Sequence, residues 1–117
     1  MESTQKLYDL TMVESISGGD QGFIRKMLQL FIDTMPQSIG ELQSALQQEN
    51  WDMVGKYAHK MKSTIDSMGI VLLKEDIRTV EQSGKNKTGL EAVPALIAKV
   101  ADTIHQCIAQ IKKDFGL

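Results

Sequence analysis

Apolar residues recur along much of the chain at steps of three or four positions, which is the spacing of one face of an α-helix. The longest such run predicts a helix over residues 21–49, because the Gly18-Gly19 pair breaks the chain before it and Asp20 offers a side chain that can cap it. Pro36 lies inside this run and removes one backbone donor, so we expect a bend there. The predicted buried face of this helix consists of Ile24, Met27, Leu28, Phe31, Met35, Ile39, Leu42 and Leu46.

Two more helical runs follow in the sequence. Asn50 can cap the first, from Trp51 to Met68, and Gly69 is interpreted as its left-handed end. Its apolar positions are Val54, Tyr57, Ala58, Met61, Ile65 and Met68. The second run carries Leu73, Ile77 and Val80 on one face. We expect it to close at Ser83-Gly84, before a polar loop over residues 85–89.

A last helix is predicted to open at Thr88 or Gly89 and to close with Lys112 and Lys113, where positive charge suits the helix dipole. Its apolar face consists of Val93, Ile97, Val100, Ile104, Ile108, Ile111 and Phe115. A short helical segment is also expected around residues 9–16. Four amphipathic helices with short connections bury their faces best side by side. We therefore expect one all-α domain over residues 1–117, an antiparallel four-helix bundle with a short N-terminal covering helix.

Composition narrows the classes of function. Aromatic residues make up only 5% of the chain, and 13 Lys and Arg against 15 Asp and Glu give a net charge of −2, so neither a sheet, a nucleic-acid partner nor a membrane partner is expected. Cys107 is the only cysteine, which excludes an internal disulfide and favours a cytoplasmic location. Residues 1–5 lack the basic and apolar regions of a signal peptide, and no apolar run approaches the roughly 20 residues that span a bilayer.

His59 does not fit the buried face of its helix. A turn of about 100° per residue places its imidazole roughly opposite the centre of the apolar face, so we expect it to face water. Gly55 is expected to point outward beside it and to leave space for a partner's backbone or a phosphoryl group. Lys56, Lys60 and Lys62 make this region locally basic, which favours a phosphoryl group or an acidic partner.

Three interpretations of His59 follow from the residues alone. An uncharged imidazole is a nucleophile near neutral pH, and a phosphoryl group on it remains transferable. A plain surface histidine in a helical adaptor is the simplest alternative. A metal-binding bundle is the third, but di-iron bundles carry Glu three residues before His, where this chain has Lys56 and, before His105, Asp102. We interpret His105 as an ordinary surface or half-buried histidine and Cys107 as a small core residue.

The segment from Ala58 to Gly69 reads A-H-K-M-K-S-T-I-D-S-M-G and resembles the active helix of histidine-containing phosphotransfer (HPt) domains, whose pattern is A-H-x-L-K-G-S-x-x-x-x-G. Met61 replaces the usual Leu and conserves volume. Ser63 replaces the common Gly, and its hydroxyl could either donate a hydrogen bond to a phosphoryl oxygen or crowd an incoming partner. The resemblance extends over most of the chain, to Gly19, Asp20, Phe31, Pro36, Leu73 and Glu81.

The resemblance implies a stoichiometric phosphocarrier of a multistep phosphorelay rather than an enzyme. His59 would accept a phosphoryl group at Nε2 from the aspartyl phosphate of a response-regulator receiver domain and pass it to another receiver, and Lys62 would support the group electrostatically. A hybrid sensor histidine kinase is the other implied partner. The sequence contains no glycine-rich phosphate loop, so no ATP site and no cofactor are expected, and magnesium would be bound by the receiver.

The docking surface is predicted to surround His59 on the same helix, and the protein is expected to be a monomer because its four apolar faces can satisfy one another. Trp51 leaves two interpretations open, contact with a partner or packing over the turn between helices. The predicted docking residues are Gly55, Lys56, Lys60, Ser63, Asp66 and Gly69.

Overall fold

The computed structural model describes residues 6–117, and within that range the chain forms helices and no strand. Residues 1–5, which the signal-peptide argument concerns, lie outside the described residues. Two 3-10 turns, η1 (Val71–Leu73) and η2 (Leu90–Ala92), lead into the last two helices. The α-helices are α1 (Thr11–Ser17), α2 (Gln21–Gln47), α3 (Trp51–Ser67), α4 (Lys74–Asn86) and α5 (Val93–Phe115).

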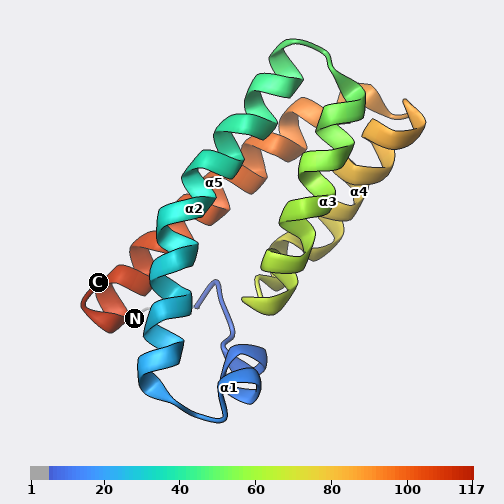
Figure 1. Ribbon diagram of the computed structural model, residues 1–117. Coiled ribbons are helices and arrows are strands. Elements are labelled where there is room, and N and C mark those ends of the chain that lie inside the picture. Colours follow the sequence, from blue (N-terminus) through green and yellow to red (C-terminus); the bar gives the residue numbers. More distant parts are fainter. Residues whose placement is uncertain (1–5) are drawn as a thin grey trace.

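The four longer helices pack side by side as an antiparallel bundle, and α1 lies at the lower end in the view of Figure 1. The N-terminal segment is held there by a hydrogen bond of 2.9 Å from the Asp9 backbone N–H to the carbonyl oxygen of Met68. The predicted fold class, including the short covering helix, is therefore confirmed. None of the helices in residues 6–117 is long and apolar enough to cross a bilayer.

The predicted start of the last helix at Thr88 or Gly89 is wrong, because a 3-10 turn (η2) comes first and α5 begins at Val93. The predicted starts of α2 and α3 are confirmed by their caps. The Asp20 carboxylate accepts hydrogen bonds from the backbone N–H groups of Gly22 and Phe23, at 2.9 and 3.3 Å, and so caps α2. The Asn50 side chain accepts one from Met53 and caps α3. Both contacts satisfy backbone donors that have no partner inside the helix. α2 continues through Pro36, and the bend expected there remains a prediction.

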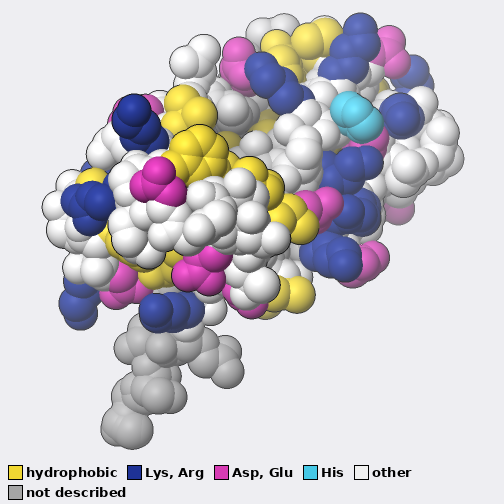
Figure 2. Space-filling model, turned by 60° about the horizontal axis from the view of Figure 1, so that its bottom comes forward, with side chains coloured by type: hydrophobic (Ala, Val, Ile, Leu, Met, Phe, Trp, Pro, Cys, Tyr) yellow, Lys and Arg dark blue, Asp and Glu magenta, His cyan; other side chains and the backbone are white. Residues whose placement is uncertain are grey.

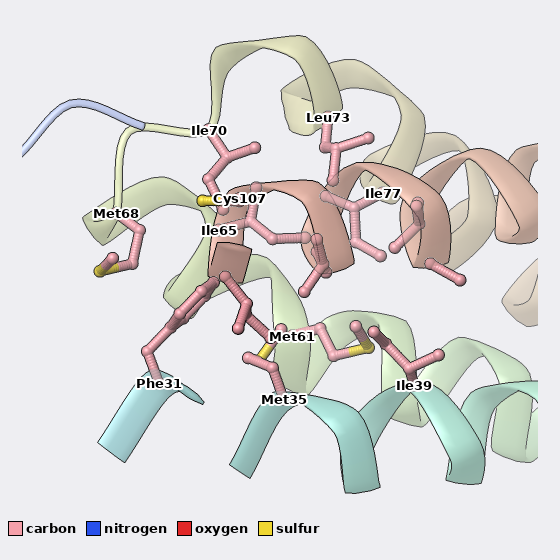
Figure 3. Packing of buried hydrophobic residues seen from close by; sticks show 14 of the residues in the cluster. Phe31, Met35, Ile39, Met61, Ile65, Met68, Ile70, Leu73, Ile77 and Cys107 are labelled. Carbon is pink, nitrogen blue, oxygen red and sulfur yellow. The ribbon is translucent and has the colours of Figure 1, made fainter. Parts of the chain in front are cut away.

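Side chains from all four long helices meet in one core (Figure 3). Methionines fill gaps in it, since Met35, Met61 and Met68 are buried as predicted, whereas Met27 is only half-buried. Cys107 is fully buried, and burial raises the pKa of its thiol to about 12. It is therefore a core residue, as the sequence predicts.

The polar loop predicted over residues 85–89 is wrong at its start. α4 does not close at Gly84 but continues to Asn86, and Lys87 then ends it in a left-handed conformation with φ 55°. Gly84 is buried inside the helix. Gly84 therefore does not end the helix but packs against α3. The sequence of α4 alone could not show this, because the contact depends on the neighbouring helix.

Candidate functional site

His59 lies on the exposed side of α3, with 64% of its side chain accessible to solvent. Its predicted exposure is confirmed. The ring is nonetheless anchored, because Nδ1 lies 2.5 Å from Oε2 of Glu81, which comes from the neighbouring helix α4. The face shown in Figure 2 carries a histidine at the surface with basic side chains on several sides.

Glu81 is the buried centre of this site. Its side chain is only 3% exposed, and Lys62 Nζ lies 2.9 Å from its Oε1 while Lys85 Nζ lies 3.7 Å from its Oε2. Burial alone raises the pKa of this carboxyl, but the hydrogen bonds and positive charges of Lys62 and His59 outweigh burial and hold the pKa below its usual value. Glu81 is therefore an ionised acceptor near neutral pH.

An ionised carboxylate can only accept hydrogen bonds, so the hydrogen at this contact belongs to Nδ1 of His59. In the neutral ring the other nitrogen, Nε2, then carries the free lone pair. The contact therefore selects the tautomer in which the nitrogen away from Glu81 is the nucleophilic one.

The expectation that Gly55 points outward is wrong. Gly55 is buried against α4, and a Cβ placed on it would lie 3.2 Å from the backbone nitrogen of Lys85. A glycine contributes nothing to an apolar periodicity, so the pattern of side chains could not show that this side of α3 is covered. Gly55 still borders a surface hollow beside the imidazole, lined by Asp52, Gly55, Lys56, His59 and Lys85.

Three other predicted docking residues are exposed close to His59 on α3, namely Lys56, Lys60 and Ser63. Lys60 also borders a groove between α2 and α3 that includes the exposed side chain of Leu30. Their exposure leaves them accessible to a partner, and their role in docking stays a prediction.

Asp66 and Gly69 are engaged elsewhere. Arg78 of α4 donates two hydrogen bonds to the Asp66 carboxylate, at 3.1 and 2.6 Å, and lowers its pKa. Gly69 has φ 62°, and a Cβ there would lie 2.5 Å from the carbonyl oxygen of Asp9. Its glycine is therefore explained by the turn after α3 and by the N-terminal segment packed against it.

The remaining candidates are placed as follows. Trp51 is half-buried and packs against the core, which agrees with the packing interpretation. His105 is exposed on α5. Among the side chains of residues 6–117, no group of three or more His, Cys, Asp or Glu is arranged to hold a metal ion.

The sequence argument did not identify the role of Glu81, which entered only as a position of family resemblance. A signal was present, because Glu81 follows Ile77 by one helical turn on the apolar face of α4. A carboxylate on a buried face needs a partner. Which partner it finds depends on how α3 and α4 align.

Comparisons with known proteins agree with this geometry. The profile of the Hpt domain family matches residues 26–114, a range that includes all of α3 and α4. Among solved structures, the crystal structure of histidine-containing phosphotransfer protein B (HptB) from Pseudomonas aeruginosa PAO1 has a similar fold, with a TM-score of 0.83 and 22% sequence identity over 95% of this chain and 96% of that one. No curated protein matches the chain.

Proposed function

The chain belongs to the Hpt domain family and is a histidine-containing phosphotransfer protein of a phosphorelay, and from this premise we propose that His59 is its phosphoacceptor. The observation that carries the proposal is the exposed imidazole whose Nδ1 is held by the buried carboxylate of Glu81. An exposed ring can meet a partner, and a fixed tautomer presents one nucleophilic nitrogen to it.

In the proposed step, the lone pair of His59 Nε2 attacks the phosphorus of an aspartyl phosphate on the partner. A nitrogen–phosphorus bond forms while the bond between phosphorus and the aspartyl oxygen breaks, and the partner's aspartate leaves as a carboxylate. The ring keeps its Nδ1 proton and gains a positive charge, which the Glu81 carboxylate offsets at 2.5 Å. Onward transfer is the same step in reverse, to the aspartate of another partner.

Lys62 is proposed to have two roles in this step, one toward Glu81 and one toward the phosphoryl group. Its ammonium group lies 2.9 Å from Glu81 Oε1 and so helps to keep that carboxylate ionised. It is also one helical turn from His59, where its charge supports a phosphoryl group. The exposed Lys56 and Lys60 extend the basic surroundings of the imidazole.

We assign the partners as receiver domains of response regulators and a hybrid sensor histidine kinase, with magnesium bound by the receiver. The protein itself would be a stoichiometric carrier without ATP binding or autokinase activity, in one domain over residues 1–117, monomeric and cytoplasmic. The lack of a glycine-rich phosphate loop in the sequence supports a carrier that does not bind ATP. The single cysteine, which is free and buried, supports the cytoplasmic location.

Label transfer tests the proposal. The protein is incubated with a phosphorylated receiver domain and magnesium, and label is followed on the wild type, on His59→Gln and on the matched control His105→Gln. We expect label on the wild type and on the control, lost in acid and stable in base, and none on His59→Gln. Equal labelling of His59→Gln would contradict the assignment, and failure of the wild type with a broad panel of receivers would favour an adaptor without chemistry.

A further inference from the structure

Gly55 of α3 and Gly84 of α4 face each other where these two helices touch. A Cβ placed on Gly84 would lie 2.6 Å from the backbone nitrogen of Gly55 and 2.8 Å from the carbonyl oxygen of Trp51. Both distances are shorter than real Cβ contacts, and both neighbours are backbone atoms that cannot rotate away. The present separation of α3 and α4 therefore requires glycine at position 84.

Backbone conformation does not explain these glycines. Both lie inside helices, and neither is among the residues with positive φ. Glycine inside a helix also lowers its stability relative to alanine. The close approach of the two backbones is the remaining explanation.

The glycine contact is adjacent to the candidate site. Glu81 precedes Gly84 by three residues on α4, and His59 follows Gly55 by four on α3, so each stands one helical turn from its glycine. Since the helices are antiparallel, the same register pairs Gly55 with Gly84 and His59 with Glu81. The distance of 2.5 Å from Nδ1 to Oε2 therefore depends on how closely the helices approach one turn away.

Ion pairs flank this register on both sides, Asp52 with Lys87 at 2.9 Å and Asp66 with Arg78 at 2.6 Å. The first pair is exposed and the second is partly buried. Ion pairs near the surface contribute little free energy, and their long side chains can follow small shifts of the helices. They are compatible with the register but do not fix the separation of the backbones. The glycines fix this separation, because there is no space for a side chain at position 84.

We propose that Gly84 and Gly55 are positioning residues for phosphotransfer. By allowing α3 and α4 to touch along their backbones, they keep Glu81 on Nδ1 of His59 and so fix the ring with Nε2 free of hydrogen. This inference rests on the proposed role of His59 as phosphoacceptor. It adds that the tautomer of this histidine is set by the spacing of two helices.

The first test measures the imidazole itself, through the ¹⁵N chemical shifts of the His59 ring, which report its tautomer. The variants are Gly84→Ala, Gly55→Ala and the control Gly40→Ala, whose added Cβ would meet nothing within 4 Å. We expect the fraction of ring hydrogen on Nδ1 to fall most in Gly84→Ala, less in Gly55→Ala and not at all in the control. This order follows the contact distances of 2.6 and 3.2 Å.

The second test asks whether the glycine acts through Glu81. Gly84→Ala is made alone and together with Glu81→Met, which removes the acceptor at similar volume. Because small displacements of a reacting group slow a reaction strongly, we expect Gly84→Ala alone to lower the rate of phosphotransfer about tenfold. In the Glu81→Met background it should cause no further loss.

Two results would overturn the inference. One is an unchanged His59 ring in folded Gly84→Ala, or in Gly55→Ala if Gly84→Ala does not fold. The other is the same fold-loss of rate with and without Glu81. The ring measurement does not depend on phosphotransfer, so a failure of the proposed function, seen as labelling of His59→Gln, is distinguishable from a failure of this inference.

Discussion

At the scale of single residues, the site consists of the exposed ring of His59, which can meet a partner, and the buried carboxylate of Glu81, which holds that ring. The exposure of His59 could be predicted from the sequence because this residue lies opposite the apolar face of its own helix, which local periodicity determines. Its role as phosphoacceptor came only from the resemblance to the HPt family. Its contact with Glu81 could not be predicted, because that contact depends on the register of α3 against α4. The predicted orientation of Gly55 failed for the same reason.

A conservative substitution can remove the negative charge of Glu81 while its contact with His59 is kept. Glu81→Gln keeps an oxygen that accepts from Nδ1 but loses the negative charge that offsets a charged ring. A charge-assisted hydrogen bond contributes about 1.5–3 kcal/mol, so we expect the initial rate of phosphotransfer to fall roughly 10- to 100-fold while the helical fold is retained.

The matched control is Asp76→Asn. It also removes a carboxylate of α4 that pairs with a neighbouring helix, but its partner is Lys99 of α5 and not the imidazole. We expect its transfer rate to stay close to that of the wild type. Equal losses in the two variants would show that the charge beside His59 has no special role.

At the scale of helices, the capped starts of α2 and α3 were predictable, whereas the start of α5 at Val93 and the end of α4 at Asn86 were not. The caps at Asp20 and Asn50 are local, since each side chain bonds backbone groups two or three residues ahead. The end of α4 is not local. Gly84 resembles a stop signal in the sequence, but close packing on Gly55 and Trp51 keeps it inside the helix.

Replacing a glycine inside a helix by alanine should change the free energy of unfolding in opposite directions at two positions of this chain. Gly40 lies exposed inside α2 with open space where a Cβ would be, so Gly40→Ala should raise the free energy of unfolding by about 1 kcal/mol through helix propensity alone. Gly84→Ala should lower it, because its Cβ meets backbone atoms. Urea unfolding at constant m-value checks both signs, and a stabilised Gly84→Ala would contradict the packing described for α3 and α4.

At the scale of the whole molecule, the four apolar faces were sufficient to predict an antiparallel bundle. They did not predict how the two chain ends are joined to it. Tyr8 donates a hydrogen bond of 2.5 Å to Asp114, and Arg25 donates one of 2.8 Å to the carbonyl oxygen of Phe115. These partners lie far apart in the sequence and polar contacts carry no periodic signal, so only the folded chain shows them.

The buried carboxylate also predicts how global stability depends on pH. The pKa of Glu81 is lowered in the folded protein, so the folded state binds protons less readily than the unfolded state in acid. Its contribution to stability is therefore full above the ordinary value of 4.5 and is lost as the pH falls through the lower folded value. Asp66 has the same sign because Arg78 lowers its pKa.

We expect the urea midpoint of the wild type to fall from pH 7 to pH 3, and Glu81→Gln to lose less over the same interval. Both proteins are compared with one m-value analysis at each pH. An identical loss in Glu81→Gln would mean that this carboxyl does not contribute to acid sensitivity.

The central claim is that His59 carries the phosphoryl group on Nε2 while Glu81 holds Nδ1. The most direct measurement is NMR of the phosphorylated protein labelled with ¹⁵N in its two histidines. The account predicts a coupling between phosphorus and Nε2 of His59, with hydrogen still on Nδ1. Phosphorus on Nδ1, phosphorus on His105, or no coupling to either ring would contradict it.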